Sequence, residues 1–135
     1  MLFADLIGKN VLIVEDDSLQ ASAMRVAMEY QGSQVVGPFP DLDDGFAALE
    51  QKPVDIAILD VSLNAQKVFP LADELTERGI PFVFVTGYDR HFLPPRFQKS
   101  ACVVKPLGDE DLAFAVAISI IGARNGGSNR AKDIT

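Results

Sequence analysis

Apolar and polar positions alternate along this chain in blocks of regular length. Five short apolar runs occupy residues 10–14, 33–37, 54–59, 81–85 and 101–104. The segments between or after them have a helical pattern and occupy residues 18–31, 42–51, 70–78 and 109–124. Apolar runs that alternate with helices are typical of a parallel sheet covered by helices on both faces. The pattern predicts an α/β fold with a doubly wound, five-stranded parallel sheet.

The first helical segment repeats apolar side chains with the 3.6-residue period of an amphipathic helix. These side chains are Leu19, Ala23, Val26, Ala27 and Tyr30. They lie on one face of the predicted helix. Gly32 and Gly79 follow two of the helical segments, and glycine is common where helices end. Both are therefore predicted to stop a helix.

Residues 87–100 interrupt the alternation where a fourth helix belongs. Pro94 and Pro95 prevent a regular helix through this point, so we expect a loop or one short turn, with the fourth helix short or missing. Residues 125–135 are almost devoid of apolar side chains and are expected to form a flexible tail. We expect one domain over residues 1–124 and no output domain.

The composition excludes several classes of function. The chain has 135 residues, 48% of them hydrophobic, and no apolar stretch as long as a membrane span. Its net charge is −7 and its basic residues do not cluster, which argues against nucleic-acid binding. One cysteine, Cys102, rules out an internal disulfide, and the first ten residues lack the pattern of a signal peptide. We expect a cytoplasmic protein that binds neither nucleic acid nor membrane.

Polar side chains follow four of the five apolar runs. They are Glu15 and Asp16 after the first run, Asp60 after the third, Thr86 after the fourth and Lys105 after the fifth. The carboxyl ends of parallel strands meet at one edge of a sheet, where ligands bind. We therefore expect these side chains to form a single site.

The chemistry of this set points to phosphoryl transfer. Taken alone, the acids at 15–17 fit a solvated turn equally well, with Asp17 or Ser18 capping the next helix, but the other strand ends favour a site. Clustered carboxylates suit Mg²⁺, which binds one or two of them with water and phosphoryl oxygens. A lysine and a hydroxyl can hold the remaining phosphoryl oxygens, and a carboxylate can act as the nucleophile. The set predicts Mg²⁺-dependent phosphorylation of Asp60.

These motifs resemble the receiver domain of two-component response regulators, over about residues 9–122. The resemblance is carried by Glu15-Asp16 in VLIVEDD, Asp60 in AILDVSL, Thr86 in VFVTG and Lys105-Pro106 in VVKPL. It implies a flavodoxin-like sheet with strand order 2-1-3-4-5. It also implies a single-domain regulator that catalyses its own phosphorylation and dephosphorylation, with a sensor histidine kinase or phosphotransfer protein as the donor. Such a protein signals through protein contacts or acts as a phosphate sink.

The resemblance also implies roles for individual residues. Asp60, Thr86 and Lys105 would be the catalytic residues. Asp16 and Asp60 would ligate Mg²⁺ with the backbone carbonyl of Ser62, and Glu15 would act mainly through a metal-bound water. The segments PFVFVTGYD and DVSLNAQKVFPLADEL resemble a narrower group, the stand-alone alphaproteobacterial receivers with a Phe-Ala-Thr-Gly-Tyr-like motif. That group implies a kinase of the HWE or a related type.

The signal-transmitting position departs from the common receiver pattern. Most receivers carry an aromatic residue three positions before the lysine, and this chain has Cys102 there. We therefore expect Tyr88, two residues beyond Thr86, to act as the switch together with residues 87–100. Tyr88 as a static loop anchor is an equally good interpretation. Among functions, a degenerate receiver that only binds proteins is the main alternative, and an aspartyl-nucleophile phosphatase is disfavoured by Ser62.

The last helical segment contains DLAFAVAISII, which is apolar nearly all the way round. Either residues 87–100 cover its outer side, or that side binds a partner. We favour a partner face formed by Phe114, Ile118 and Ile121, used for a homodimer or for kinase docking. The nearby phenylalanines are expected to anchor the core and the loop; they are Phe82, Phe84, Phe92 and Phe97.

Overall fold

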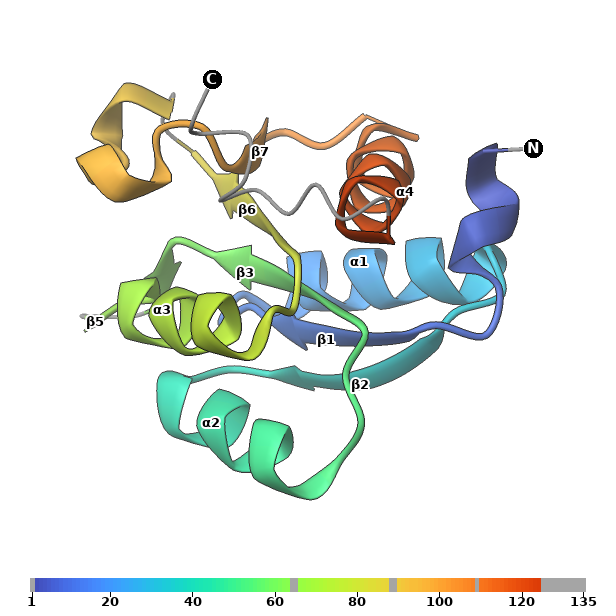
Figure 1. Ribbon diagram of the computed structural model, residues 1–135, viewed down its shortest axis with the longest axis horizontal. Helices are drawn as coiled ribbons and strands as arrows, with labels where there is room; N and C mark the ends of the chain where they lie inside the picture. Colours follow the sequence, from blue (N-terminus) through green and yellow to red (C-terminus); the bar gives the residue numbers. More distant parts are fainter. Residues whose placement is uncertain (1, 64–65, 88–89, 109, 125–135) are drawn as a thin grey trace.

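A five-stranded parallel sheet forms the centre of the computed structural model (Figure 1). The structure describes residues 2–63, 66–87, 90–108 and 110–124. The strand order is β2-β1-β3-β6-β7, and every neighbouring pair is parallel. The strands are β1 (Asn10–Val14), β2 (Gln34–Phe39), β3 (Ile56–Asp60), β6 (Phe82–Thr86) and β7 (Ala101–Val104). This is the predicted flavodoxin-like order.

Helices cover both faces of the sheet, as a doubly wound fold requires. They are α1 (Ser18–Tyr30), α2 (Leu42–Gln51), α3 (Phe69–Arg78) and α4 (Asp111–Arg124). On one face, α1 and α4 enclose a core that includes Met24, Met28 and Val116; on the other, α2 and α3 enclose a core that includes Leu49 and Leu71 (Figure 1). A 3-10 helix, η1 (Leu2–Leu6), precedes β1.

Local sequence signals set several helix ends. Asp17 caps α1, because its side chain accepts hydrogen bonds from the backbone N–H groups of Leu19 and Gln20, both at 3.0 Å. Gly79 ends α3 with φ 72°, a left-handed conformation that glycine adopts at little cost. Gly32 follows the end of α1 with φ 90°. The helix stops predicted at both glycines are thus confirmed.

The apolar face identified on α1 lies largely in solvent. Leu19, Val26 and Tyr30 are 82%, 56% and 86% exposed. The side chains that α1 buries are Ala21, Met24 and Met28. The helix carries two apolar stripes, and the two long methionines occupy the one that faces the sheet, leaving the stripe with more apolar residues in solvent.

Residues 90–97 contain two short 3-10 turns, η2 (Arg90–Phe92) and η3 (Pro95–Phe97), in place of a fourth helix. A loop or short turn was predicted there, so the absence of a regular helix is confirmed. Phe97 packs against Phe69, Phe82 and Phe84 with ring centroids 5.2–6.0 Å apart. Phe92 is 72% exposed, so it is not part of the buried core.

The outer side of α4 is not covered by the described residues of 87–100, which argues against one of the two alternatives for this helix. Leu93 and Phe97 pack into the core on the α2–α3 face, whereas α4 packs on the α1 face. The N-terminal η1 contacts α4 instead, with Leu6 fully buried. Phe114 and Ile118 on α4 remain 54% and 48% exposed.

A small hairpin follows β3 and was not predicted. Its strands, β4 (Ser62–Leu63) and β5 (Gln66–Lys67), are antiparallel, with Ser62 opposite Lys67. Backbone hydrogen bonding closes its base, since the N–H of Val68 donates to the carbonyl of Val61 at 3.0 Å. The hairpin holds two polar side chains directly beyond Asp60.

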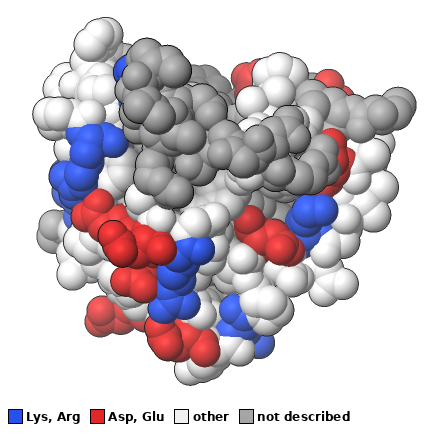
Figure 2. Space-filling view, in the orientation of Figure 1, with Lys and Arg blue, Asp and Glu red and all other residues white. Residues whose placement is uncertain are grey.

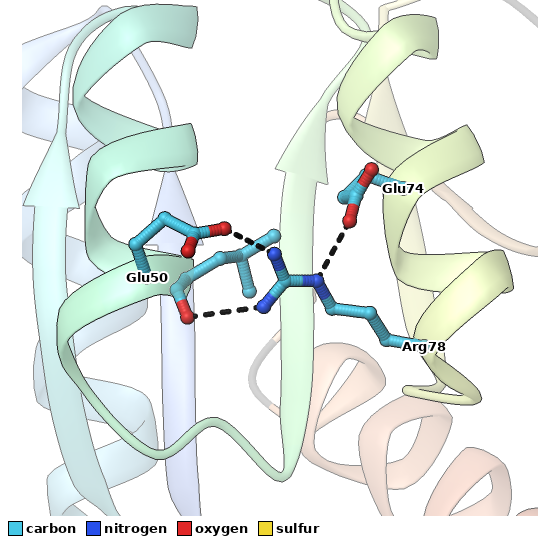
Figure 3. Close-up of polar contacts among 4 residues, drawn as sticks. Glu50, Glu74 and Arg78 are labelled. Carbon is cyan, nitrogen blue, oxygen red and sulfur yellow. Dashed lines mark hydrogen bonds and ion pairs between the residues drawn. The ribbon is translucent and has the colours of Figure 1, made fainter.

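Arg78 joins the carboxyl ends of α2 and α3 (Figure 3). Its guanidinium pairs with Glu50 on α2, and its Nε donates to Glu74 on α3 at 2.8 Å. Its Nη1 also donates to the backbone carbonyl of Leu49 at 3.2 Å, one of the carbonyls left unpaired at the end of α2. This contact fixes the two helices on the same face of the sheet.

The surface in Figure 2 carries basic side chains interspersed with acidic ones, and no basic patch appears among its described residues. None of the described helices has the length and apolar character needed to span a bilayer. The predicted tail at 125–135 and the predicted switch residue Tyr88 lie outside the described residues.

Candidate functional site

Three acidic side chains meet at the carboxyl ends of β1 and β3. Glu15 and Asp16 follow β1, and Asp60 is the last residue of β3, which pairs directly with β1. One carboxylate oxygen from each residue lies within 4.8 Å of the others. Glu15 and Asp60 are only 2% and 5% exposed. The predicted acidic cluster is therefore present and largely buried.

Glu15 has an oxygen whose hydrogen-bonding capacity is unfilled. Its Oε2 accepts from the backbone N–H of Asp17 at 3.1 Å, whereas the buried Oε1 makes no hydrogen bond among the described residues and lies 3.3 Å from the Lys105 ammonium as an ion pair. A buried carboxylate oxygen that accepts no hydrogen bond is unfavourable. A divalent cation with its water shell would satisfy this oxygen, and oxygen-only ligands are what Mg²⁺ prefers. The donor set fits such an ion.

Lys105 supplies a positive charge to this cluster. Its Nζ lies 3.3 Å from Glu15 Oε1 and 3.6 Å from Asp60 Oδ1. The residue follows β7, and its backbone N–H donates to the carbonyl of Thr86 at 2.7 Å, which ties it to the end of β6. Its side chain is 19% exposed. One ammonium group thus faces two buried carboxylates.

The protein environment opposes ionisation of Asp60. Burial, and then hydrogen bonding and charge repulsion from Glu15, raise the pKa of Asp60 to about 8, although Lys105 acts in the opposite direction. Without a metal ion, this environment therefore favours the protonated form of the Asp60 carboxyl. A bound divalent cation would displace that proton and leave a carboxylate able to act as a nucleophile.

Thr86 and Ser62 border a cavity next to Asp60. Thr86 ends β6 and is 4% exposed. The cavity has a volume of about 390 Å³ and is lined by Val61, Ser62, Lys67, Phe69, Thr86, Phe92 and Leu93. Most of its lining residues are apolar, and the polar ones are Thr86 from β6 and Ser62 and Lys67 from the β4–β5 hairpin.

Lys67 was not singled out from the sequence. Its Nζ donates to Ser62 Oγ at 2.9 Å across the hairpin. The sequence carried no clear signal for it, because the hairpin strands are only two residues long and show no alternating pattern. The predicted residues Glu15, Asp16, Asp60 and Lys105 do meet at one site.

The family model of the response regulator receiver domain matches residues 11–117. This chain belongs to the response regulator receiver family. The five-stranded sheet and the acidic cluster described above are those of a receiver domain of a two-component system, so the predicted family and fold class are confirmed.

Solved structures of receivers are similar to this one. The solution structure of SdrG from Sphingomonas melonis Fr1 is 34% identical, with a TM-score of 0.73, and the match covers 83% of this chain and 95% of that chain. The response regulator PhyR from Brucella abortus is 19% identical with a TM-score of 0.81, covering 93% of this chain and 53% of that one. The second similarity shows the fold alone.

Two curated proteins also match this receiver. The sensory transduction protein LytT from Bacillus cereus is 29% identical over 105 residues, which is 74% of this chain and 42% of LytT. The sensory transduction protein LytR from Streptococcus mutans is 28% identical over 116 residues, or 78% of this chain and 47% of LytR. The matched region thus spans less than half the length of either curated relative.

Proposed function

We propose that this receiver is a cytoplasmic, single-domain response regulator that accepts a phosphoryl group on Asp60 in a Mg²⁺-dependent reaction. The donor is a phosphohistidine of a sensor histidine kinase or of a phosphotransfer protein. The phosphorylated receiver then signals by contact with another protein or serves as a phosphate sink. The observation that supports this most is the buried Asp60 carboxyl, adjacent to two further carboxylates and 3.6 Å from the Lys105 ammonium.

The residues that would hold Mg²⁺ are Asp16, Asp60 and the backbone carbonyl of Ser62, with Glu15 acting through a metal-bound water. When bound, the ion supplies positive charge that keeps Asp60 ionised and offsets the charge of the incoming phosphoryl group. Glu15 Oε1, which accepts no hydrogen bond among the described residues, supports this assignment, because a water on the ion would give it a hydrogen-bond donor.

The transfer is a displacement at phosphorus. An ionised Asp60 carboxylate oxygen forms a bond to phosphorus while the bond from phosphorus to the donor imidazole nitrogen breaks, and the electron pair of that bond stays on the nitrogen. Lys105 Nζ is placed to donate to a phosphoryl oxygen, and the Thr86 hydroxyl to donate to another. The product is an acyl phosphate on Asp60.

The exposed stripe of α1 fits a kinase or phosphotransfer partner. Leu19 is the second residue of α1, close to Glu15 and Asp16 in the sequence, and Val26 and Tyr30 continue the stripe along α1. A partner that delivers a phosphoryl group to Asp60 has to lie over this end of the sheet. Such a partner would bury the apolar stripe, and we assign it to a histidine kinase, of the HWE or a related type.

The exposed side of α4 fits a second copy of the chain. Phe114 and Ile118 are about half exposed, and Ile121 is partly buried beside them. Exposed apolar side chains grouped on one helix face are a common basis for protein association. We propose a homodimer through this face of α4.

The response to phosphorylation is proposed to start at Thr86 and to continue through Tyr88 and residues 87–100. Cys102 is half-buried on β7 and carries no aromatic ring that could change position. The two 3-10 turns at Arg90–Phe92 and Pro95–Phe97 offer little helical hydrogen bonding to resist a shift of this segment.

Incubation with Mg²⁺ and acetyl phosphate, followed by intact mass measurement, tests the proposed function. We expect one added phosphoryl group in the wild type and none in Asp60→Asn. Asp43→Asn, which changes an exposed acid on α2, serves as the matched control and should be phosphorylated normally. An unchanged wild-type mass would favour a receiver that acts only as a binding module.

A further inference from the structure

Lys67 is a second ammonium group beside the phosphoacceptor. It lies on β5, and its Nζ donates to Oγ of Ser62, only two residues beyond Asp60. The Cα atoms of residues two apart are separated by no more than about 7 Å, a distance that a lysine side chain can span. Lys67 and Thr86 also line the same cavity. The hairpin therefore keeps this ammonium within reach of a group bound to Asp60.

The net charge of the phosphorylated site would be negative without a second cationic side chain. Glu15 and Asp16 contribute two negative charges, and a phosphoryl group on Asp60 adds two more. Lys105 and a divalent cation together contribute three positive charges, so one negative charge remains uncompensated. The ammonium of Lys67 would compensate it. An uncompensated charge in a partly buried site is unfavourable, which favours a direct interaction.

We infer that Lys67 is a second phosphoryl-binding cation, which donates a hydrogen bond to a phosphoryl oxygen on Asp60 while Lys105 holds another. The inference rests on the proposed phosphorylation of Asp60. An ammonium group has three N–H donors, so Lys67 can keep its bond to Ser62 and still bind the phosphoryl group. Ser62 then orients Lys67, and the β4–β5 hairpin positions both.

The competing interpretation is that Lys67 only ties the two hairpin strands together. The two interpretations differ in how binding responds to charge and to salt. A hairpin tie depends on the hydrogen bond to Ser62 alone. A cation that binds a phosphoryl group depends on the charge, which an arginine retains and a glutamine lacks, and its contribution falls when salt screens the exposed ammonium.

Binding of beryllofluoride, a phosphoryl mimic, to the Mg²⁺-loaded receiver tests this directly. The variants are Lys67→Gln, Lys67→Arg and the control Lys52→Gln, which removes an exposed lysine at the end of α2. We expect Lys67→Gln to weaken beryllofluoride binding by about threefold to tenfold, as for a partly exposed charge-assisted hydrogen bond. Lys67→Arg should restore most of the affinity, and Lys52→Gln should match the wild type.

The salt dependence of beryllofluoride binding, together with the wild-type affinity, distinguishes the two interpretations of Lys67. We expect the difference in beryllofluoride affinity between the wild type and Lys67→Gln to become smaller at about 1 M salt, where the Debye length is about 3 Å. If the wild type binds beryllofluoride and Lys67→Gln binds it with the same affinity, this inference is overturned while the proposed phosphorylation stands. A loss that arginine does not rescue and salt does not reduce assigns Lys67 to the hairpin alone. A wild type that binds no beryllofluoride overturns both.

Discussion

Lys105 Nζ lies 3.6 Å from Asp60 Oδ1, although the two residues come from strands β7 and β3, which are separated by β6 in the sheet. The contact exists because Lys105 follows a strand at the sheet edge and its backbone is tied to Thr86. This places a positive charge where negative charge builds up when a phosphoryl group reaches Asp60.

Replacing Lys105 should therefore impair the reaction more than the fold. We expect Lys105→Ala to slow phosphorylation by acetyl phosphate by about tenfold or more, or to block the structural response to it. The rate is measured by intact mass against time, and the response by amide chemical shifts. Equality with the wild type in both measurements would show that the proposed site is wrong.

The raised pKa of Asp60 should make the metal-free protein less stable at high pH. A carboxyl whose pKa is about 8 in the folded state and near 4 in the unfolded state binds more protons when folded between these values. Its contribution to the free energy of unfolding therefore falls as pH rises from about 4 to about 8.

Asp60→Asn removes this titration. We expect the gain in stability of Asp60→Asn over the wild type to be larger at pH 8 than at pH 5 by at least about 1 kcal/mol, which corresponds to roughly one pKa unit. Urea unfolding in the presence of a chelator measures the difference, and Asp43→Asn is the control. A gain that does not change with pH would mean that Asp60 is ionised in the folded protein.

Substitutions in the exposed apolar stripe on α1 should slow phosphotransfer from the kinase without changing phosphorylation by acetyl phosphate. We expect Leu19→Glu to slow phosphotransfer from a histidine kinase by about tenfold or more, since a charge at an apolar interface is unfavourable, while leaving phosphorylation by acetyl phosphate unchanged. Ile7→Glu is the matched control, because Ile7 is 64% exposed and precedes Gly8, whose N–H donates to the carbonyl of Gly32 beyond the other end of α1. Equal phosphotransfer in the two variants would place the kinase elsewhere.

The exposed side of α4 should control self-association. Ile118→Glu puts a charge beside Phe114. We expect the wild type to sediment as a dimer and Ile118→Glu to sediment as a monomer. Sedimentation is measured with and without phosphorylation. The melting temperature should stay near that of the wild type, because Ile118 is 48% exposed. A wild type that is monomeric in both conditions would contradict the proposed dimer.

The sequence was sufficient for the fold and for the acidic cluster because both depend on strand ends. Each buried strand is a short apolar run, and a parallel sheet brings the residues after these runs to one edge, so Glu15, Asp16, Asp60 and Lys105 were predicted together. The pattern did not show which face of α1 is buried. Period alone does not distinguish the stripe of Leu19 and Val26 from that of Met24 and Met28, since both repeat every three or four residues.

Contacts between short segments were beyond what the pattern could predict. The β4–β5 hairpin depends on four residues, and Lys67 reaches Ser62 only because the chain turns back directly after Asp60. The covering of α4 by η1 likewise depends on tertiary packing, in which Leu6 is buried. Tyr88 lies outside the described residues, and its role as a switch stays a prediction.

Chemical trapping of the phosphorylated residue tests the central claim most directly. Borohydride reduces an aspartyl phosphate to homoserine, so the receiver is treated with Mg²⁺ and acetyl phosphate, reduced, and mapped by peptide mass spectrometry. The account predicts homoserine at position 60 and at no other acidic residue, with none formed when Mg²⁺ is removed by a chelator. Aspartate retained at position 60, or homoserine at position 16 or 17 instead, would contradict it.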